Sequence, residues 1–300
     1  MSPRLGIDLG GTKIEIIALD PRGETLMQRR VPTPQGRYRE TLTAIAELVR
    51  LAEDALGASG SVGIGVPGSP SPSTGLMRNA NSVCLNGQPL QADLEALLAR
   101  PVALSNDANC LALSEATDGA ARAAASVFGV ILGTGTGGSV VFDGRLQAGG
   151  NGNAGEWGHN PLPWPTAAEV PGPACWCGLH GCLETYLSGP GMARDHLEHT
   201  GIALEAAEIA RRAAVGDAAS ELTLRRYEDR LARGLAHVIN ILDPEVIVLG
   251  GGLSNIQRLY RNVPMIWASY VFSDRVTTRL VAPRFGDSSG VRGAAWLGAR

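Results

Sequence analysis

The feature that most constrains the fold is a pair of strands broken by glycine, which occurs twice in the chain. The apolar runs Leu5–Gly10 and Phe128–Gly133 both end at a glycine and continue through further glycines into a second apolar run. Equivalent glycines and aspartates of the two copies are separated by the same number of residues. Each copy ends in a turn signal, Asp20-Pro21-Arg22-Gly23 or Asp143-Gly144. The repeat predicts two related domains, each led by a β-hairpin.

Segments with helical periodicity alternate with further strands. Apolar residues recur at steps of three and four over Tyr38–Leu56 and Glu221–Leu242, and another helix is expected to begin near Asp107 and run towards Ala116. Buried strands are expected at Val102-Ala103-Leu104 and at Val246-Ile247-Val248-Leu249. This alternation predicts an α/β layered fold in both halves.

Composition excludes several classes of protein. With 300 residues, of which 44% are hydrophobic and 18% charged, the chain can bury two cores and is not disordered. No apolar run approaches the roughly 20 residues that a membrane helix needs. The net charge of −3 comes without a polybasic run, which argues against nucleic acid as a partner. Because nothing at the N-terminus resembles a secretion signal, we expect a soluble cytoplasmic protein.

Three of the five cysteines lie within eight residues of one another, close to two histidines. Cys175, Cys177 and Cys182 with His159 would supply a tetrahedral Zn²⁺ site. With protein ligands on all four sides the ion has no open position for water, so we interpret it as structural. His180 is an alternative fourth ligand that spacing leaves open, and three reduced cysteines without metal are the plain alternative. Gly178 and Gly181 would permit the tight turns of such a loop.

The glycine turns are candidate phosphate sites. Backbone without Cβ can approach a phosphate closely, and its free N–H groups form an anion-binding concavity, although each turn could equally be an ordinary hairpin. Lys13 is the only lysine among 26 basic residues. It suggests a compact ammonium beside a phosphate, although a single lysine could also remain by chance in a chain that otherwise uses arginine. Asp8 ends a strand beside the first turn, where it would hold Mg²⁺ or bond the turn backbone.

The chain contains several longer motifs: Asp8-Leu9-Gly10-Gly11-Thr12-Lys13, Asn106-Asp107-Ala108-Asn109, Glu156-Trp157-Gly158-His159, the run Cys175–Glu184, Val248-Leu249-Gly250-Gly251-Gly252 and the tail Gly286–Trp296. Together they resemble the ROK family of sugar kinases over the whole chain, and within it most of all the bacterial fructokinase branch, also called manno(fructo)kinase. The cysteine run and the Glu156/His159 pair are the specific signatures, since glycine turns are common.

The resemblance implies a fold of two ribonuclease-H-like domains, of the actin and hexokinase type, around an interdomain cleft. The smaller N-terminal domain would contain residues 1–117 and 288–300, and the larger C-terminal domain residues 118–287. The last helix, at about 289–299, would pack on the N-terminal domain.

The resemblance also implies a role for each candidate residue. Asp107 would be the general base, although its spacing alone equally fits a helix N-cap. The sugar would be bound by Asn106, Glu156, His159, Glu184, Gly68 and Asn81. ATP, with Mg²⁺ near Asp8, would contact Gly10, Gly11, Thr12, Lys13, Gly133, Thr134, Gly135, Gly250, Gly251 and Gly252.

The reaction that the resemblance implies is ATP-dependent phosphorylation of a hexose at its 6-hydroxyl, with D-fructose as the expected substrate. Glucose, mannose or an N-acetylhexosamine is the alternative substrate. A sugar-sensing regulator and an actin-like ATPase are the alternatives from other classes. A homodimer is expected by resemblance alone. The Pro-rich stretch Pro161–Pro173 would cover the sugar site or contact a partner subunit.

Overall fold

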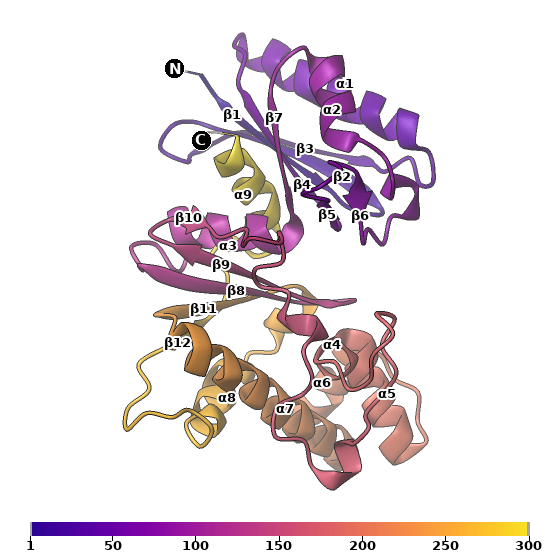
Figure 1. Ribbon diagram of the computed structural model, residues 1–300, viewed down its shortest axis with the longest axis vertical. Coiled ribbons are helices and arrows are strands. Elements are labelled where there is room, and N and C mark those ends of the chain that lie inside the picture. Colours follow the sequence, from indigo (N-terminus) through magenta and orange to yellow (C-terminus); the bar gives the residue numbers. More distant parts are fainter. Residues whose placement is uncertain (1, 299–300) are drawn as a thin grey trace. The chain divides into compact units, whose positions relative to one another are not determined.

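The computed structural model describes residues 2–298, which form two compact units (Figure 1). Of these residues, unit 1 contains 2–123, 144–153 and 284–298, and unit 2 contains 124–143 and 154–283. Both units combine a β-sheet with helices, as the alternating pattern predicted. The predicted α/β class is therefore confirmed.

The units differ from the predicted domains in three segments. The prediction assigned residues 118–123, 144–153 and 284–287 to the larger domain, whereas they belong to unit 1. The Glu115 carboxylate holds two of these segments, because it accepts hydrogen bonds from the backbone N–H groups of Ala120 at 2.7 Å and Arg284 at 3.0 Å. Arg78 holds the third by donating to Asn153 Oδ1 at 3.1 Å. Residue 299, in the last predicted helix, lies outside the described residues, as do residues 1 and 300.

A five-stranded sheet in the order β3-β2-β1-β4-β7 forms the centre of unit 1. The first three strands are antiparallel neighbours, and the last two run parallel to β1. Along β1, Leu5, Ile7 and Leu9 are buried in the main core of the unit. The strands are β1 (Arg4–Leu9), β2 (Lys13–Leu19), β3 (Thr25–Pro32), β4 (Ser61–Val66) and β7 (Val102–Asn106).

Helices cover both faces of this sheet (Figure 1). On one side lie α1 (Tyr38–Leu56) and α2 (Leu90–Leu98), and on the other α3 (Asp107–Thr117) and α9 (Ser289–Leu297). Gly6 and Gly63, paired across β1 and β4, leave no room for a side chain beneath α9. A Cβ would stand 2.2 Å from the Val291 oxygen in the first case and 1.9 Å from the Ala294 oxygen in the second. The glycines therefore let α9 lie directly on the sheet.

Unit 2 repeats this plan with strands in the order β9-β8-β11-β12. An antiparallel hairpin is again followed by strands parallel to its first strand. The strands are β8 (Ser126–Leu132), β9 (Thr136–Phe142), β11 (Val246–Gly250) and β12 (Arg279–Val281), and β10 (Arg145–Leu146) follows β9 in the chain. The helices are α4 (Glu184–Leu187), α5 (Gly189–Thr200), α6 (Ala206–Ala214), α7 (Ala218–Leu242) and α8 (Leu259–Trp267).

The expected helices are all present, with small differences at their ends. The bounds of α1 match the prediction, and α3 begins at Asp107 as expected. Helix α7 begins at Ala218 instead of Glu221, because the Asp217 side chain caps it by accepting from the Ser220 N–H at 2.8 Å. In unit 1 two short strands, β5 (Ser69–Pro70) and β6 (Met77–Arg78), form a separate ribbon that the sequence pattern did not predict.

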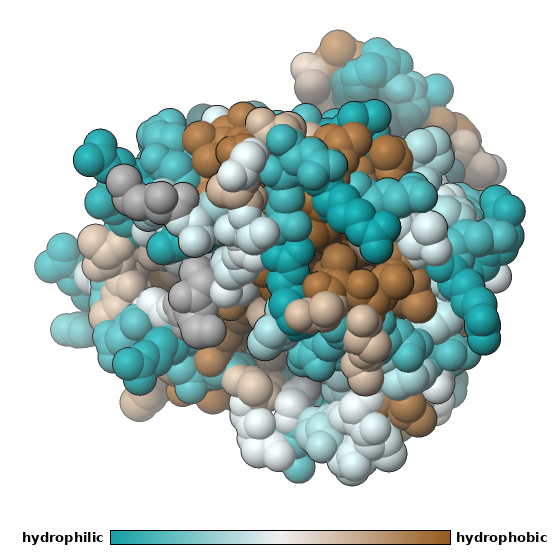
Figure 2. Space-filling view, turned by 90° about the horizontal axis from the view of Figure 1, so that it is seen from above, coloured by the Kyte–Doolittle hydropathy of each residue, from teal (hydrophilic) through white to brown (hydrophobic). Residues whose placement is uncertain are grey.

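Within residues 2–298 no helix is both long enough and apolar enough to cross a membrane. On the face seen in Figure 2, hydrophilic residues in teal surround separate groups of hydrophobic residues in brown.

Candidate active site

The carboxyl ends of three parallel strands in unit 1 bring together the predicted acidic residues. Asp8, near the end of β1, pairs in register with Gly65 of β4, and Gly65 pairs with Ser105 of β7. Asn106 ends β7 and Asp107 follows it directly. Ligands of open α/β sheets bind at this edge of the sheet.

Burial and neighbouring charge change the acidity of Asp8. Burial, together with the negative charges of Asp107 and Glu15, raises the pKa of its carboxyl from 3.8 to about 6, although the positive charges of Lys13 and Arg30 lower it. Glu15 stands opposite Asp8 on β2 and is itself buried. A carboxylate in such a place is stabilised by a bound cation, which is the role that the sequence predicted for Asp8.

The start of α3 shows which residue caps the helix. Asn106 is the N-cap, because its side chain accepts from the Asn109 N–H at 2.8 Å. Asp107, the first helical residue, is exposed, and its Oδ1 accepts from the Ala108 N–H at 2.8 Å. The competing interpretation of Asp107 as the helix N-cap is therefore wrong.

The first glycine turn joins β1 to β2. The Gly10 N–H donates to the Lys13 oxygen at 3.0 Å, and a Cβ on Gly10 would stand 2.9 Å from that oxygen, so the tight turn requires glycine. The Lys13 ammonium lies 3.8 Å from the buried Glu15 carboxylate. Lys13, which the sequence analysis predicted to lie beside a phosphate, therefore has a carboxylate partner in its own strand, β2.

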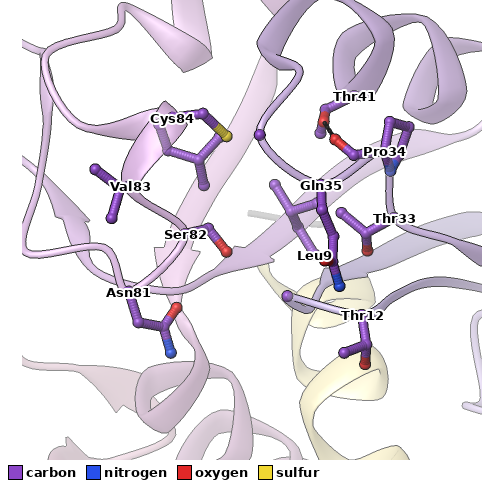
Figure 3. A pocket seen from close by; sticks show the side chains of 13 residues that line it. Leu9, Thr12, Thr33, Pro34, Gln35, Thr41, Asn81, Ser82, Val83 and Cys84 are labelled. Atoms are coloured by element: carbon purple, nitrogen blue, oxygen red, sulfur yellow. Dashed lines mark hydrogen bonds between the residues drawn. The ribbon is translucent and has the colours of Figure 1, made fainter.

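A cavity of about 410 Å³ lies beside this turn, and Figure 3 shows the side chains that line it. Gly11 and Thr12 line it together with Asn81, whose segment also contributes Ser82 and Cys84. The opposite wall comes from Gln35, in the loop between β3 and α1, and from Thr41 in the first turns of α1. Two residues that the prediction placed in different sites, Thr12 and Asn81, therefore line the same cavity.

Gly68 positions the segment that carries Asn81. It has a φ of +73°, and a Cβ there would stand 2.3 Å from the Arg78 oxygen and 2.7 Å from the Ala80 nitrogen. The absence of a side chain lets the two loops touch. Gly68 thus sits against the residues just before Asn81, as expected if both serve one site.

The second glycine turn, in unit 2, is tied to a predicted sugar ligand. The Glu184 Oε2 accepts from the Thr136 N–H at 2.9 Å, and a Cβ on Gly135 would stand 2.7 Å from the same oxygen. The Gly133 oxygen accepts from the Gly189 N–H at 2.8 Å. One N–H at the end of the turn is therefore already paired with a carboxylate.

The Gly133 turn borders a second cavity, of about 840 Å³. Gly133, Thr134 and Gly252 line it, so two regions that the sequence assigned to the nucleotide share one pocket. Gly251 has a φ of +78°, and a Cβ would stand 2.5 Å from the Leu132 oxygen, which keeps this turn against β8. Sequence reasoning missed the other wall, built by Pro190, Glu205, Ala207, Ala210, Gln257 and Arg258.

Three cysteine sulfurs and one imidazole nitrogen converge in unit 2. The ligand atoms of His159, Cys175, Cys177 and Cys182 all lie within 4.8 Å of one another. The sulfurs of Cys177 and Cys182 are 3.6 Å apart, and the Cys175 sulfur is 3.5 Å from His159 Nδ1. Tetrahedral zinc, with Zn–S bonds of about 2.3 Å, separates two sulfurs by about 3.8 Å. The donor set and its spacing therefore fit a zinc ion.

The local backbone explains this convergence. Residues 160–162 pair with 181–183 through hydrogen bonds from the Leu183 N–H to the Asn160 oxygen and from the Leu162 N–H to the Gly181 oxygen. Gly178 and Gly181 have positive φ values, as the predicted turns required. His180 is exposed and outside the cluster, so the geometry favours His159 as the fourth ligand. Glu156 is exposed just before His159.

The Pro-rich stretch has a partner inside unit 2. Glu169, within this stretch, makes hydrogen bonds with Arg230 and Arg233 of α7 at 2.8 and 2.9 Å. Burial alone would raise the pKa of Glu169, but these two arginines lower it to about 2. The stretch is thus anchored on α7.

The relatives of the chain point to one family. The sequence profile of the ROK family matches residues 4–300. The chain belongs to the ROK family. The predicted membership in this family of sugar kinases is thereby confirmed. A Yersinia pseudotuberculosis protein named N-acetyl-D-glucosamine kinase, from serotype O:1b, is 40% identical over 97% of both chains.

Solved structures of ROK proteins share the fold. The crystal structure of the ROK hexokinase from Thermus thermophilus covers 98% of this chain and 97% of its own, with a TM-score of 0.88 and 33% identity. A ROK family glucokinase from Streptomyces griseus, solved in complex with glucose and AMPPNP, covers 99% of both chains with a TM-score of 0.79 and 27% identity. The hexokinase-type fold predicted from the motifs is therefore confirmed.

The raised pKa of Asp8 predicts how stability depends on pH. Between about pH 4 and pH 6 the folded state keeps the Asp8 proton and the unfolded state loses it, so stability falls as the pH rises through this range. We expect Asp8→Asn to abolish this loss, which amounts to at most about 3 kcal/mol. Thermal unfolding at pH 4 and pH 7.5 measures it: the variant should gain several degrees over the wild type only at pH 7.5.

The exposed Asp54 on α1 provides a control for this experiment. Asp54→Asn should leave the pH dependence unchanged. An equal gain for Asp8→Asn at both pH values would contradict the raised pKa.

Proposed function

We propose that the chain transfers the γ-phosphate of ATP to the 6-hydroxyl of an N-acetylhexosamine, with N-acetyl-D-glucosamine as the first choice. The observation that carries this proposal is the 40% identity, over nearly the whole of both chains, to a protein named for that activity. Fructose was the expected substrate, and an N-acetylhexosamine was an alternative. The relatives support the alternative better.

The proposed sugar ligands are Asn106, Glu156, His159 and Glu184, with Gly68 and Asn81 at the amide substituent. Carboxylates and imidazole accept from or donate to ring hydroxyls with fixed geometry. An acetamido group offers one N–H donor and one carbonyl acceptor, and the exposed Asn81 amide can pair with both. The contact between Gly68 and the segment preceding Asn81 supports a common role for these two residues.

The proposed nucleotide site uses both glycine turns. Gly10, Gly11, Thr12 and Lys13 in unit 1, and Gly133, Thr134 and Gly135 in unit 2, would bind the phosphates through backbone N–H groups and side chains. The adenosine would occupy the 840 Å³ cavity beside Gly250, Gly251 and Gly252. Mg²⁺ bound with ATP would neutralise phosphate charge, and Asp8 is the side chain proposed to hold it, directly or through water.

Asp107 is the proposed general base. Its carboxylate would accept the proton of the 6-hydroxyl while that oxygen forms a bond to the γ-phosphorus and the bond to the β-γ bridging oxygen of ATP breaks. The products are the sugar 6-phosphate and ADP. Because α3 fixes Asp107 at the carboxyl edge of the sheet, the base is held in place before the substrate arrives.

The cluster of His159, Cys175, Cys177 and Cys182 is the proposed site of a structural Zn²⁺. The ion would fix the loop that carries His159 and precedes Glu184, both proposed sugar ligands. The predicted homodimer stays a prediction, since no observation on this chain bears on its assembly.

A hexose panel tests the proposed reaction. We expect ADP release, followed in a coupled assay, to have its highest kcat/KM with N-acetyl-D-glucosamine and lower values with N-acetyl-D-mannosamine, glucose, mannose and fructose. Phosphorus NMR should identify the product as the 6-phosphate. A higher kcat/KM with fructose than with the other sugars would instead support D-fructose, the substrate expected from the sequence. The absence of turnover with every hexose would refute the proposed kinase activity.

Asp107→Asn tests the base. Removal of a general base typically lowers turnover by about 10²–10⁴-fold, and we expect a loss of kcat in this range with little change in the KM for the sugar. Folding should persist, because Asn106 and not Asp107 caps α3. The matched control is Glu40→Gln, which alters an exposed first-turn carboxylate of α1 and should leave kcat unchanged. A variant of Asp107 with kcat near the wild type would remove it from the mechanism.

A further inference from the structure

Trp176 is a large aromatic residue whose position is not explained by packing. The residue is 68% exposed, although it lies between two members of the metal cluster, Cys175 and Cys177. An indole left this open to water gains little from burial. Specific contacts must therefore hold it in place.

Two contacts join Trp176 to proposed sugar ligands. The indole Nε1–H donates to Glu184 Oε1 at 2.7 Å. The indole ring also packs edge-to-face against His159, with 4.8 Å between the ring centroids. Both partners belong to unit 2, and both were assigned to the sugar from the sequence.

The metal cluster sets the direction of the indole. The Gly178 N–H donates to the Cys175 oxygen at 3.0 Å, which closes a turn with Trp176 and Cys177 at its centre. Because cluster members stand at the first and third positions of this turn, anything that fixes their sulfurs also fixes the backbone of Trp176. The indole N–H is thereby aimed at Glu184.

Glu184 is held from the other side as well. While Oε1 accepts from Trp176, Oε2 accepts from the Thr136 N–H at 2.9 Å. A carboxylate has about four lone-pair sites, so both oxygens can still accept a sugar hydroxyl. Two donors on different oxygens leave the half-buried carboxylate a single orientation before any ligand binds.

We propose that Trp176 is a positioning residue of the sugar site, which holds the Glu184 carboxylate in its sugar-binding orientation and transmits to it the order of the metal-bound turn. This proposal rests on the proposed function, in which Glu184 binds a sugar hydroxyl. A carboxylate oriented in advance loses no rotamer freedom when the sugar binds, which strengthens sugar binding. The same gain applies to the ground state and the transition state, so it appears in KM and not in kcat.

Trp176→Phe tests the proposal, because phenylalanine keeps an aromatic ring beside His159 but has no N–H to donate. Loss of one hydrogen bond to a charged acceptor should raise the KM for N-acetyl-D-glucosamine by about five- to twenty-fold. We expect kcat and the KM for ATP to stay within about two-fold, since the bond from Thr136 remains. Zinc per chain, by elemental analysis, should equal that of the wild type. Phe272→Leu, at a fully exposed aromatic residue of unit 2, is the control and should change none of these values.

Two results would overturn the proposal: a sugar KM of Trp176→Phe within two-fold of the wild type, or a rise in both KM values together with loss of zinc, which would show a purely structural role. If the wild type prefers another hexose, the same comparison with that hexose tests Trp176 independently of the substrate assignment. A wild type that phosphorylates no hexose would refute the proposed function itself.

Discussion

The convergence of three sulfurs and one imidazole nitrogen is the interaction on which the proposed sugar site depends. Residues 160–183 contain little regular secondary structure, and such a segment loses conformational entropy on folding without the hydrogen bonds of a helix or sheet. Metal binding to such clusters contributes roughly 10–16 kcal/mol in small zinc domains, enough to order a loop of this kind. Metal binding, and not sugar binding, would then compensate the entropy that His159, Trp176 and Glu184 lose when they become ordered.

In unit 1 the backbone alone fixes where the predicted acidic residues lie. Its parallel strands end side by side, and α3 begins directly after β7, so the backbone places Asp107 at the edge where Asp8 lies. The negative charges of Asp107 and Glu15 help to raise the pKa of Asp8, and the bound cation that we propose would reduce this repulsion. The proposed ligands in unit 2 would thus be ordered by metal ligation, and the acidic residues of unit 1 are ordered by their backbone.

Sequence patterns predicted the parts of the fold that depend on local chemistry. Helix α1, the hairpins of the repeat and the glycines of the cysteine loop all follow from periodicity or from backbone conformations that only glycine adopts readily. The start of α7 was missed because the Asp217 cap lies outside the apolar pattern. The wall of the 840 Å³ cavity was missed for a different reason. Pro190, Glu205 and Gln257 come from separate elements, and only tertiary packing brings them together.

The most direct test of this account is zinc K-edge X-ray absorption on the purified protein, with metal content measured on the same sample. The account predicts one zinc per chain with three sulfur ligands at about 2.3 Å and one nitrogen ligand at about 2.0 Å. A protein that is free of metal with its cysteines reduced and its kinase activity intact would contradict it, as would a zinc ion with an oxygen ligand in place of the nitrogen.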